Sequence, residues 1–199
     1  MRKPTPTELG YLDVSTIPGV VVDLRYASTN NFTGKNVYGD FRTAYLHEIA
    51  HAKLFKAAER LSELKPGFTL VVFDTLRPAW AQEILFSHVA GTPQEPYIAN
   101  PKEGSVHSYG FAVDLSILDD RNMELDMGTG FDDFSELSEP QLEEKFEKEG
   151  RLSSAHLANR GLLREVMTYA GFIQAPNEWW HFDALALHEI KGRYPRYEG

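Results

Sequence analysis

The chain has 199 residues, of which 42% are hydrophobic and 25% charged, a composition typical of an ordinary globular protein with one full core. Its formal net charge of -9 disfavours a nucleic-acid backbone or an anionic membrane surface as the main partner. The absence of cysteine excludes disulfides, thiolate nucleophiles and cysteine-based zinc fingers, so a bound metal must be held by histidine and carboxylate.

The two ends of the sequence carry few structural signals. We expect residues 1–10 to be a loose lead-in and residues 193–199 a polar tail. Residues 1–8 carry positive charge with no apolar segment behind them, so they do not have the form of a signal peptide, and no run is long enough to span a membrane. The simplest interpretation is a cytoplasmic protein, although a trimmed leader would leave the same sequence and make the periplasm the alternative.

The first third of the chain contains one predicted strand and one predicted helix. Residues 20–26 are rich in β-branched side chains and favour a strand. Apolar residues recur at helical spacing over residues 43–64, which predicts an amphipathic helix. His47 and His51 lie four residues apart in it, a spacing that can bind metal. Because the glutamate of the helical zinc proteases is missing between them, we interpret both as surface or packing residues.

A second strand leads to an arginine of interest. The continuous apolar run at residues 68–73 predicts a buried strand, and residues 79–89 predict a helix with Pro78 at its start. Arg77 is therefore placed at a strand end, where loops commonly carry function. An arginine there can pair with a carboxylate for structural reasons, or its fixed fork of donors can bind a substrate carboxylate or a developing oxyanion.

The most informative segment is residues 105–117. It contains His107 and, seven residues later, Asp114 at the centre of an alternating apolar run. A carboxylate in such a run is costly to desolvate unless a cation or a dense set of donors holds it, so Asp114 requires a partner. Near the C-terminus, Glu178 and His181 flank two tryptophans. Two histidines and one aspartate form a ligand set that zinc accepts in catalytic sites, so these residues favour a zinc hydrolase.

Taken singly, each of these residues also has a structural interpretation. A histidine beside a strand is more often a hydrogen-bonded structural residue than a ligand. Asp114 can cap a turn or pair with an arginine, and Glu178 and His181 can form the polar edge of an aromatic cluster. The joint pattern, however, is much less probable by chance than any one member of it.

The remaining elements follow from turn residues and periodicity. Residues 119–122 predict a hairpin turn, and the Gly-rich, aromatic segment 127–134 indicates a close backbone approach. The acidic stretch 139–149 predicts a solvated helix or lid. A second amphipathic helix is predicted over residues 153–170, followed by a strand pair or extended segment over residues 172–182.

These motifs resemble a known family. The spacings Ser105-x-His107-x-x-Gly110-x-Ala112-x-Asp114 and Glu178-x-x-His181 are similar to the signature of the LAS-type zinc peptidases of the D-alanyl-D-alanine peptidase clan. A narrower resemblance, to the D-alanyl-D-alanine dipeptidases of the vancomycin-resistance type, rests on Arg25-Tyr26-Ala27, Asn31-Phe32-Thr33-Gly34, Arg77-Pro78, Met127-Gly128-x-x-Phe131-Asp132 and Glu178-Trp179-Trp180-His181. The resemblance extends from about Val20 to Phe182, most of the chain.

The resemblance implies a role for each residue of a catalytic site. The zinc ligands would be His107, Asp114 and His181, with one ion per chain. Glu178 would be the general base, and Arg77 would stabilise the tetrahedral intermediate.

The resemblance also implies a dipeptide pocket. Tyr26, Ser105 and Asp132 match positions that line it, and Asp132 is suited to an ammonium group. One departure from the family is visible, because the residues before Arg77 are Thr75-Leu76, where the family commonly has Gly-Tyr. This difference bears on the shape of the site around Arg77.

For the whole molecule we expect a single compact α+β domain over residues 1–199. It would contain a small antiparallel sheet that carries the zinc site, with the helices 43–64 and 153–170 packed behind it. Periodicity predicts the helices, whereas the antiparallel sheet comes from the resemblance.

The expected activity is zinc-dependent hydrolysis of D-alanyl-D-alanine to two D-alanines. One alternative is a D,D-carboxypeptidase or L,D-endopeptidase of the same clan that acts on larger peptidoglycan peptides. Another is a non-catalytic zinc-binding or ligand-sensing domain. The expected partner is a small D,D-dipeptide, and a homodimer is compatible with the sequence. Whether the reaction serves vancomycin resistance or D-alanine salvage stays open.

Overall fold

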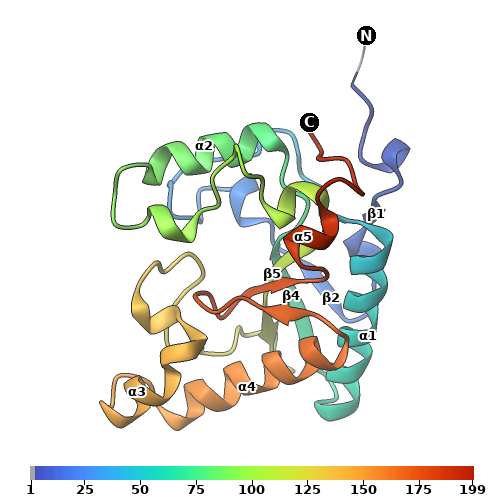
Figure 1. Ribbon diagram of the computed structural model, residues 1–199. Coiled ribbons are helices and arrows are strands. Elements are labelled where there is room, and N and C mark those ends of the chain that lie inside the picture. Colours follow the sequence, from blue (N-terminus) through green and yellow to red (C-terminus); the bar gives the residue numbers. More distant parts are fainter. Residues whose placement is uncertain (1–2) are drawn as a thin grey trace.

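A five-stranded mixed sheet forms the centre of the structure, which is a computed structural model that describes residues 3–199 (Figure 1). β2 and β4 are parallel, and the other neighbouring strands are antiparallel. In spatial order the strands are β2 (Val20–Val22), β4 (Thr69–Asp74), β5 (Ala112–Leu118), β7 (His181–Asp183) and β6 (Ile173–Gln174). A separate antiparallel pair joins β1 (Leu12–Asp13) to β3 (Tyr45–Leu46).

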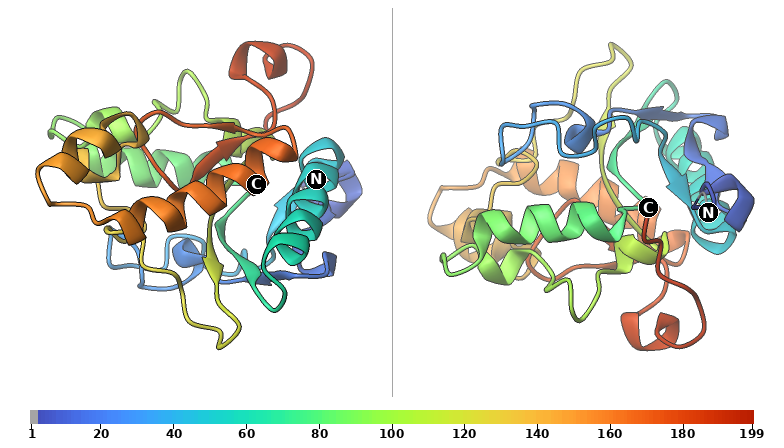
Figure 2. Two further views of the ribbon diagram at one scale, coloured as in Figure 1. Left: turned by 90° about the horizontal axis from the view of Figure 1, so that it is seen from below. Right: turned by 90° about the horizontal axis from the view of Figure 1, so that it is seen from above.

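Helices cover both sides of this sheet. α1 packs against α4 and β4, and α4 packs against β6. α2 lies on the opposite side of the molecule from α4, with the central strands between them (Figures 1 and 2). The α-helices are α1 (Glu48–Leu64), α2 (Ala79–Val89), α3 (Glu143–Lys148), α4 (Ser154–Tyr169) and α5 (Leu187–Ile190). Short 3-10 helices lie at Thr7–Leu9, Val14–Thr16, Arg25–Ala27, Glu95–Tyr97, Val106–Tyr109, Glu136–Ser138 and Pro140–Leu142.

The expected α+β class and the two long helices are confirmed, with shifted boundaries. The sheet that carries the central segment contains one parallel pair, β2 with β4, in addition to the expected antiparallel pairs. The first long helix begins at Glu48 because Tyr45–Leu46 pairs with β1. His47 has extended backbone, caps the helix by accepting a hydrogen bond from the Ile49 amide, and stacks on Phe111.

The acidic stretch does contain a helix, α3, that is mostly exposed, but two of its side chains are buried. In the acidic stretch, Glu143 is only 8% exposed and Phe146 is fully buried. Glu143 tolerates burial because it accepts hydrogen bonds from Arg164 at 2.8 and 2.7 Å. The C-terminal tail is docked, since Tyr197 is 7% exposed and its backbone bonds to Ser108 and Ala79.

The core consists of one large apolar cluster between the sheet and the helices and a small one formed by Tyr11, Leu76 and Tyr197. The strands β4 and β5 are buried along almost their whole length, which explains why their sequences consist mostly of apolar residues. Within residues 3–199, no helix combines the length and the apolar character that crossing a membrane requires.

Candidate active site

Three neighbouring strands bring polar residues to one end of the sheet. Asp114 of β5 pairs with Asp74 of β4 on one side and with His181 of β7 on the other. Residues directly opposite each other in antiparallel strands project from the same face, so these three side chains gather at one place. His107 reaches it from the 3-10 helix that precedes β5, and Gly110, with a φ of 72°, provides the left-handed turn between them.

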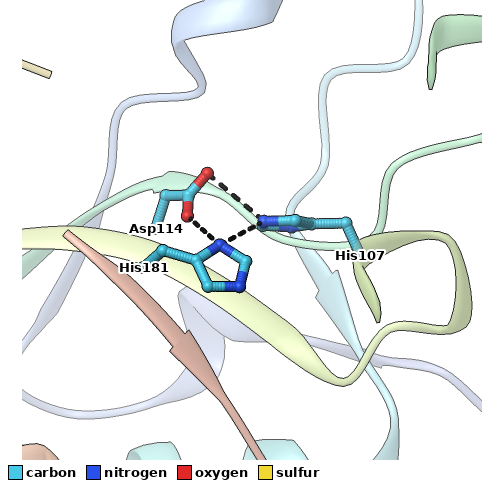
Figure 3. A group of neighbouring side chains, drawn as sticks. All are labelled: His107, Asp114 and His181. Carbon is cyan, nitrogen blue, oxygen red and sulfur yellow. Dashed lines mark hydrogen bonds and ion pairs between the residues drawn. The ribbon is translucent and has the colours of Figure 1, made fainter. Parts of the chain in front are cut away.

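His107, Asp114 and His181 point their polar atoms toward one another (Figure 3). His107 Nε2 is 3.3 Å from Asp114 Oδ2 and 3.2 Å from His181 Nδ1. His181 Nδ1 is 2.9 Å from Asp114 Oδ1. Asp114 is 3% exposed and His107 is 2% exposed, so the group lies at the base of a depression in the surface.

The far nitrogen of each imidazole has its own acceptor. His107 Nδ1 lies 2.7 Å from the carbonyl oxygen of Thr75. His181 Nε2 lies 2.9 Å from Asp183 Oδ1. Because a carbonyl and a carboxylate can only accept, both far nitrogens carry a hydrogen, so a ring that loses its second proton to bind a metal would present the lone pair of its inward nitrogen. Such outer acceptors commonly orient histidines that bind a metal.

Asp114 receives the partners that its burial demands. Burial by itself raises the pKa of this carboxyl, but the contacts with His107 and His181 outweigh burial and hold the pKa below its usual range. The carboxylate is therefore ionised at neutral pH and adds negative charge between the two imidazoles.

Arg77 is fixed at the edge of the same site. Its Nε and Nη2 both donate to Asp74 Oδ2, at 2.9 and 2.7 Å, and its Nη1 donates to Gln82 at 2.8 Å. Nη2 also lies 3.7 Å from Asp114 Oδ2, and the guanidinium carbon is 5.1 Å from the centre of the Tyr26 ring. A side chain held at this many points keeps its charge in one position, so it is preorganised to stabilise an anion.

Glu178 lies just before β7, and its carboxyl group points toward the group formed by His107, Asp114 and His181. It is 9% exposed, and its Oε2 is 3.9 Å from His181 Nδ1. Burial raises the pKa of Glu178 to about 8. A carboxyl group with a raised pKa next to the cluster is suited to exchange protons with a reacting molecule.

Asp132 and Tyr26 form a second polar group in the wall. Tyr26 donates from its hydroxyl to Asp132 Oδ1 at 2.9 Å, and the Phe32 amide lies 3.4 Å from Oδ2. Burial raises the pKa of Asp132 to about 7. Asp132 also has a φ of 61°, an uncommon backbone for a residue other than glycine. A cationic ligand would therefore stabilise the ionised form of the Asp132 carboxyl group.

All of the predicted site residues line one cavity of about 230 Å³. They come from segments that are far apart in the sequence, and the structure brings every one of them to the same place: Tyr26, Arg77, Ser105, His107, Asp114, Asp132, Glu178 and His181. Neither Thr75 nor Leu76 lines the cavity. The Leu76 side chain instead packs with Tyr11 and Tyr197.

The two inward nitrogens match the spacing that a tetrahedral ion requires, and the Asp114 carboxylate lies within reach of both. Bonds of about 2.0–2.1 Å in tetrahedral geometry place ligand atoms about 3.3 Å apart. His107 Nε2 and His181 Nδ1 are 3.2 Å apart, close to this value, and each of these nitrogens has a different oxygen of Asp114 near it, at 3.3 and 2.9 Å. Within residues 3–199, His107, Asp114 and His181 form the group of histidine and carboxylate side chains that could hold a metal ion.

Comparison with known proteins agrees with this geometry. A family profile described as D-ala-D-ala dipeptidase matches residues 7–197. The chain belongs to the D-Ala-D-Ala dipeptidase family. A D-alanyl-D-alanine dipeptidase of Escherichia coli (strain K12) is 36% identical over 178 residues, which cover 89% of this chain and 84% of that protein.

More distant members of the family carry the same description. A D-alanyl-D-alanine dipeptidase of Enterococcus faecium is 30% identical over 197 residues, which cover 88% of this chain and 91% of that protein. One of Synechocystis sp. (strain ATCC 27184 / PCC 6803 / Kazusa) is 26% identical over 201 residues, which cover 84% and 79% of the two chains. This member of the D-Ala-D-Ala dipeptidase family is therefore a peptidase, and its histidine and aspartate cluster is able to hold a metal.

The sequence patterns did not identify the side chains that hold the site residues. Asp74 and Gln82 hold Arg77, and Asp183 holds His181. A signal for Asp183 is present, because it follows His181 by two residues and so shares its face of β7. Asp74 is also a charged residue at the end of a buried strand, but only the strand register shows that it lies beside Asp114.

Proposed function

We propose that this chain hydrolyses D-alanyl-D-alanine to two D-alanines at a zinc ion held by His107, Asp114 and His181. The observation that supports the proposal is the cavity of about 230 Å³ that contains this group together with Glu178 and Arg77. A cavity below about 300 Å³ is smaller than sites for drug-sized ligands and favours a small substrate.

When bound, zinc supplies positive charge that polarises the scissile carbonyl and lowers the pKa of a coordinated water. Glu178 takes the proton of the attacking water as the new carbon–oxygen bond forms, and gives it to the leaving amine as the carbon–nitrogen bond breaks. The raised pKa of about 8 of Glu178 favours the return of that proton, and the positive charge of a bound ion would keep Glu178 ionised for the first step. The water is consumed and Glu178 is restored, so the reaction balances.

Arg77 acts on the oxyanion that develops at the scissile carbonyl. Its guanidinium is already oriented by Asp74 and Gln82, so it does not reorganise during the reaction. A fixed cation in a buried site stabilises a developing negative charge far more than it would in water, by about 3 kcal/mol in comparable oxyanion sites.

Asp132 binds the free ammonium group of the dipeptide, with Tyr26 and Ser105 lining the pocket around it. The Asp132 carboxylate is costly to ionise where it lies, as its raised pKa of about 7 reflects. An ammonium ion offsets that cost, whereas an acyl-blocked amine offers no charge. Asp132 therefore favours a free dipeptide over the end of a longer chain.

The experiment that tests this proposal compares substrates on the zinc-loaded protein. D-Ala-D-Ala, L-Ala-L-Ala and an N-acyl-D-Ala-D-Ala are supplied in parallel, with a chelated sample as control. We expect cleavage of the free D,D-dipeptide alone, and its loss on chelation. Cleavage of the acylated substrate would favour the D,D-carboxypeptidase or L,D-endopeptidase alternative, and inactivity with zinc bound would favour a non-catalytic domain.

A further inference from the structure

The Thr129 hydroxyl lies between the two segments that carry Asp132 and Glu178. Residues 127–138 follow β5 in the chain and run beside the β6–β7 pair. In the view of Figure 1, α4 lies below both segments. Thr129 Oγ1 accepts a hydrogen bond from Trp179 Nε1 at 2.9 Å, and lies 2.9 Å from Ser138 Oγ. One hydroxyl thus connects the segment that holds Asp132 with the residue that directly follows Glu178.

The backbone polar groups of Trp179 also bind neighbours. Its amide donates to the Ser138 carbonyl at 3.0 Å, and its carbonyl accepts from Gln174 Nε2 at 3.0 Å. The side chain is 1% exposed and packs edge-on against Trp180 at 5.3 Å between ring centres. Trp179 is therefore held in one position through its backbone and its indole ring. Because Glu178 directly precedes Trp179, that position fixes the backbone from which the Glu178 side chain extends.

Arg160 of α4 also binds the segment 127–138. It is fully buried in α4, where an uncompensated charge is unusual. Its Nε donates to the Met127 carbonyl at 2.7 Å, and its Nη2 donates to the Leu137 carbonyl at 3.0 Å. These two carbonyls lie at opposite ends of the segment that carries Asp132. Nη2 is also 3.4 Å from Thr129 Oγ1.

We propose that Thr129 is a positioning residue for the dipeptidase reaction. With Ser138, Arg160 and Trp179 it forms a cluster, the Thr129 cluster, that keeps the ammonium-binding Asp132 and the base Glu178 in register. This inference rests on the proposed function, since it assigns the two segments their roles from that reaction. Thr129 does not line the cavity, so it acts through Trp179 and through its own segment.

The physical reason is the cost of a buried donor without an acceptor. Without the Thr129 hydroxyl, the indole N–H of Trp179 is left unpaired in a closed environment, so the indole shifts to find another acceptor. Glu178 and Trp180 are covalently attached on either side and shift with it. A misplacement of about 1 Å at a catalytic group can lower the rate about a hundredfold.

The test uses Thr129→Val, which keeps the shape of the side chain and removes the hydroxyl. We expect kcat for D-Ala-D-Ala to fall about tenfold to a hundredfold in the zinc-loaded variant. Thr129→Ser restores the hydroxyl and should stay within about threefold of the natural chain. Hydrogen exchange should accelerate in residues 127–138 and 175–182 together. Ser138→Ala removes only one member of the Thr129 cluster. It should lower kcat and accelerate hydrogen exchange, each by less than Thr129→Val does.

Thr69→Val is the matched control. The Thr69 hydroxyl is buried in β4 and has no hydrogen-bond partner, so its loss removes the same atom without breaking a bond. Thr69→Val should keep kcat and the exchange of both segments. If Thr129→Val lowers only the melting temperature, with kcat and KM unchanged, the hydroxyl is merely structural and the inference is wrong.

The two readouts separate this inference from the proposed function. A natural chain that does not cleave D-Ala-D-Ala with zinc bound contradicts the proposed function alone. Hydrogen exchange then decides the inference: faster exchange in both segments of Thr129→Val supports the coupling, and a change confined to residues 127–138, or none, overturns it.

Discussion

Asp114 and Glu178 are two buried carboxyl groups of one cavity with opposite shifts in pKa. The pKa of Asp114 is held below its usual range by His107 and His181, which outweigh burial. The pKa of Glu178 is raised to about 8 because burial has no comparable compensation there. A pair of carboxyl groups whose environments separate their pKa values is suited to two different chemical roles in one site.

This difference predicts separate effects of substitution. Glu178→Ala should retain zinc and lose turnover by about a thousandfold or more, because only the proton transfer is removed. His181→Ala should lose both, because one inward nitrogen disappears from the metal group. Metal content by atomic absorption and D-Ala-D-Ala turnover measure the two effects. An active, zinc-loaded Glu178→Ala protein would disprove the general-base role.

The pKa of Asp132 predicts a pH dependence of binding. Because this pKa is raised to about 7, the carboxyl group takes up a proton as the pH falls through that value. Tyr26, Asp114 and Arg77 are the other titratable or charged groups that act on it. The protonated form cannot balance an ammonium ion, so binding of a free dipeptide should weaken roughly fivefold to tenfold between about pH 7.5 and about pH 6.

The measurement uses the zinc-loaded Glu178→Ala variant, in which substrate binds without turnover and Glu178 no longer titrates. Calorimetric titration of D-Ala-D-Ala across this pH range gives the affinity. Adding Asp132→Asn should make the affinity weak and nearly independent of pH. An equally steep pH dependence without Asp132 would assign the effect to another group.

At the scale of elements, the site depends on the turn from the 3-10 helix Val106–Tyr109 into β5. Gly110 makes this turn with a φ of 72°, and its carbonyl accepts a hydrogen bond from the His47 amide at 2.9 Å. A Cβ at Gly110 would lie 2.7 Å from Tyr11 Cε1 and 3.1 Å from the His47 nitrogen. The chain therefore reverses between two residues of the candidate metal group, His107 and Asp114, at a point with no space for a side chain.

Gly110→Ala should therefore destabilise the fold by about 2–4 kcal/mol, from both the left-handed backbone and the steric conflict. It should also weaken zinc binding, because His107 and Asp114 flank the turn. Gly34→Ala is the matched control, since Gly34 has a φ of 64° with no atom near its Cβ position. That change should cost about 1 kcal/mol and leave zinc affinity alone. Urea unfolding measures the stability of the two variants, and competitive zinc titration measures their zinc affinity. Equal losses of stability in Gly110→Ala and Gly34→Ala would refute the steric argument.

At the scale of the whole molecule, segments near the two ends of the chain pack against each other. Tyr11 and Tyr197 pack edge-on at 6.1 Å between ring centres, with Leu76 buried beside them. The Tyr197 amide donates to the Ser108 carbonyl at 2.8 Å. Ser108 follows His107 directly, so the docked C-terminal segment supports the metal group from outside the cavity.

Tyr197→Ala should lower the free energy of unfolding by about 3 kcal/mol, the usual loss for a buried aromatic side chain. The backbone bond to Ser108 survives, so turnover of the folded protein should change by less than about threefold. Tyr169→Ala is a matched control, because that tyrosine is 52% exposed. Thermal unfolding of both variants tests this, and a tail that is free in solution would make them equally stable.

The sequence by itself determined the parts of this protein that depend on short-range order. The long helices follow from periodicity, because residues three and four apart share one helix face, and the buried strand β4 follows from its continuous apolar run. The polar motif residues were also found by their spacing, and they line one cavity: Ser105, His107, Asp114, Glu178 and His181.

Only the tertiary structure decided which charged residues are buried and what they contact. Glu143 belongs to an acidic run, and a local pattern cannot reveal that Arg160 and Arg164 cover it from α4. The parallel pairing of β2 with β4, the docking of Tyr197 and the bond from Trp179 to Thr129 likewise join segments distant in the chain. Such contacts depend on how the elements pack, and the free energy of that packing belongs to the whole fold rather than to any one segment.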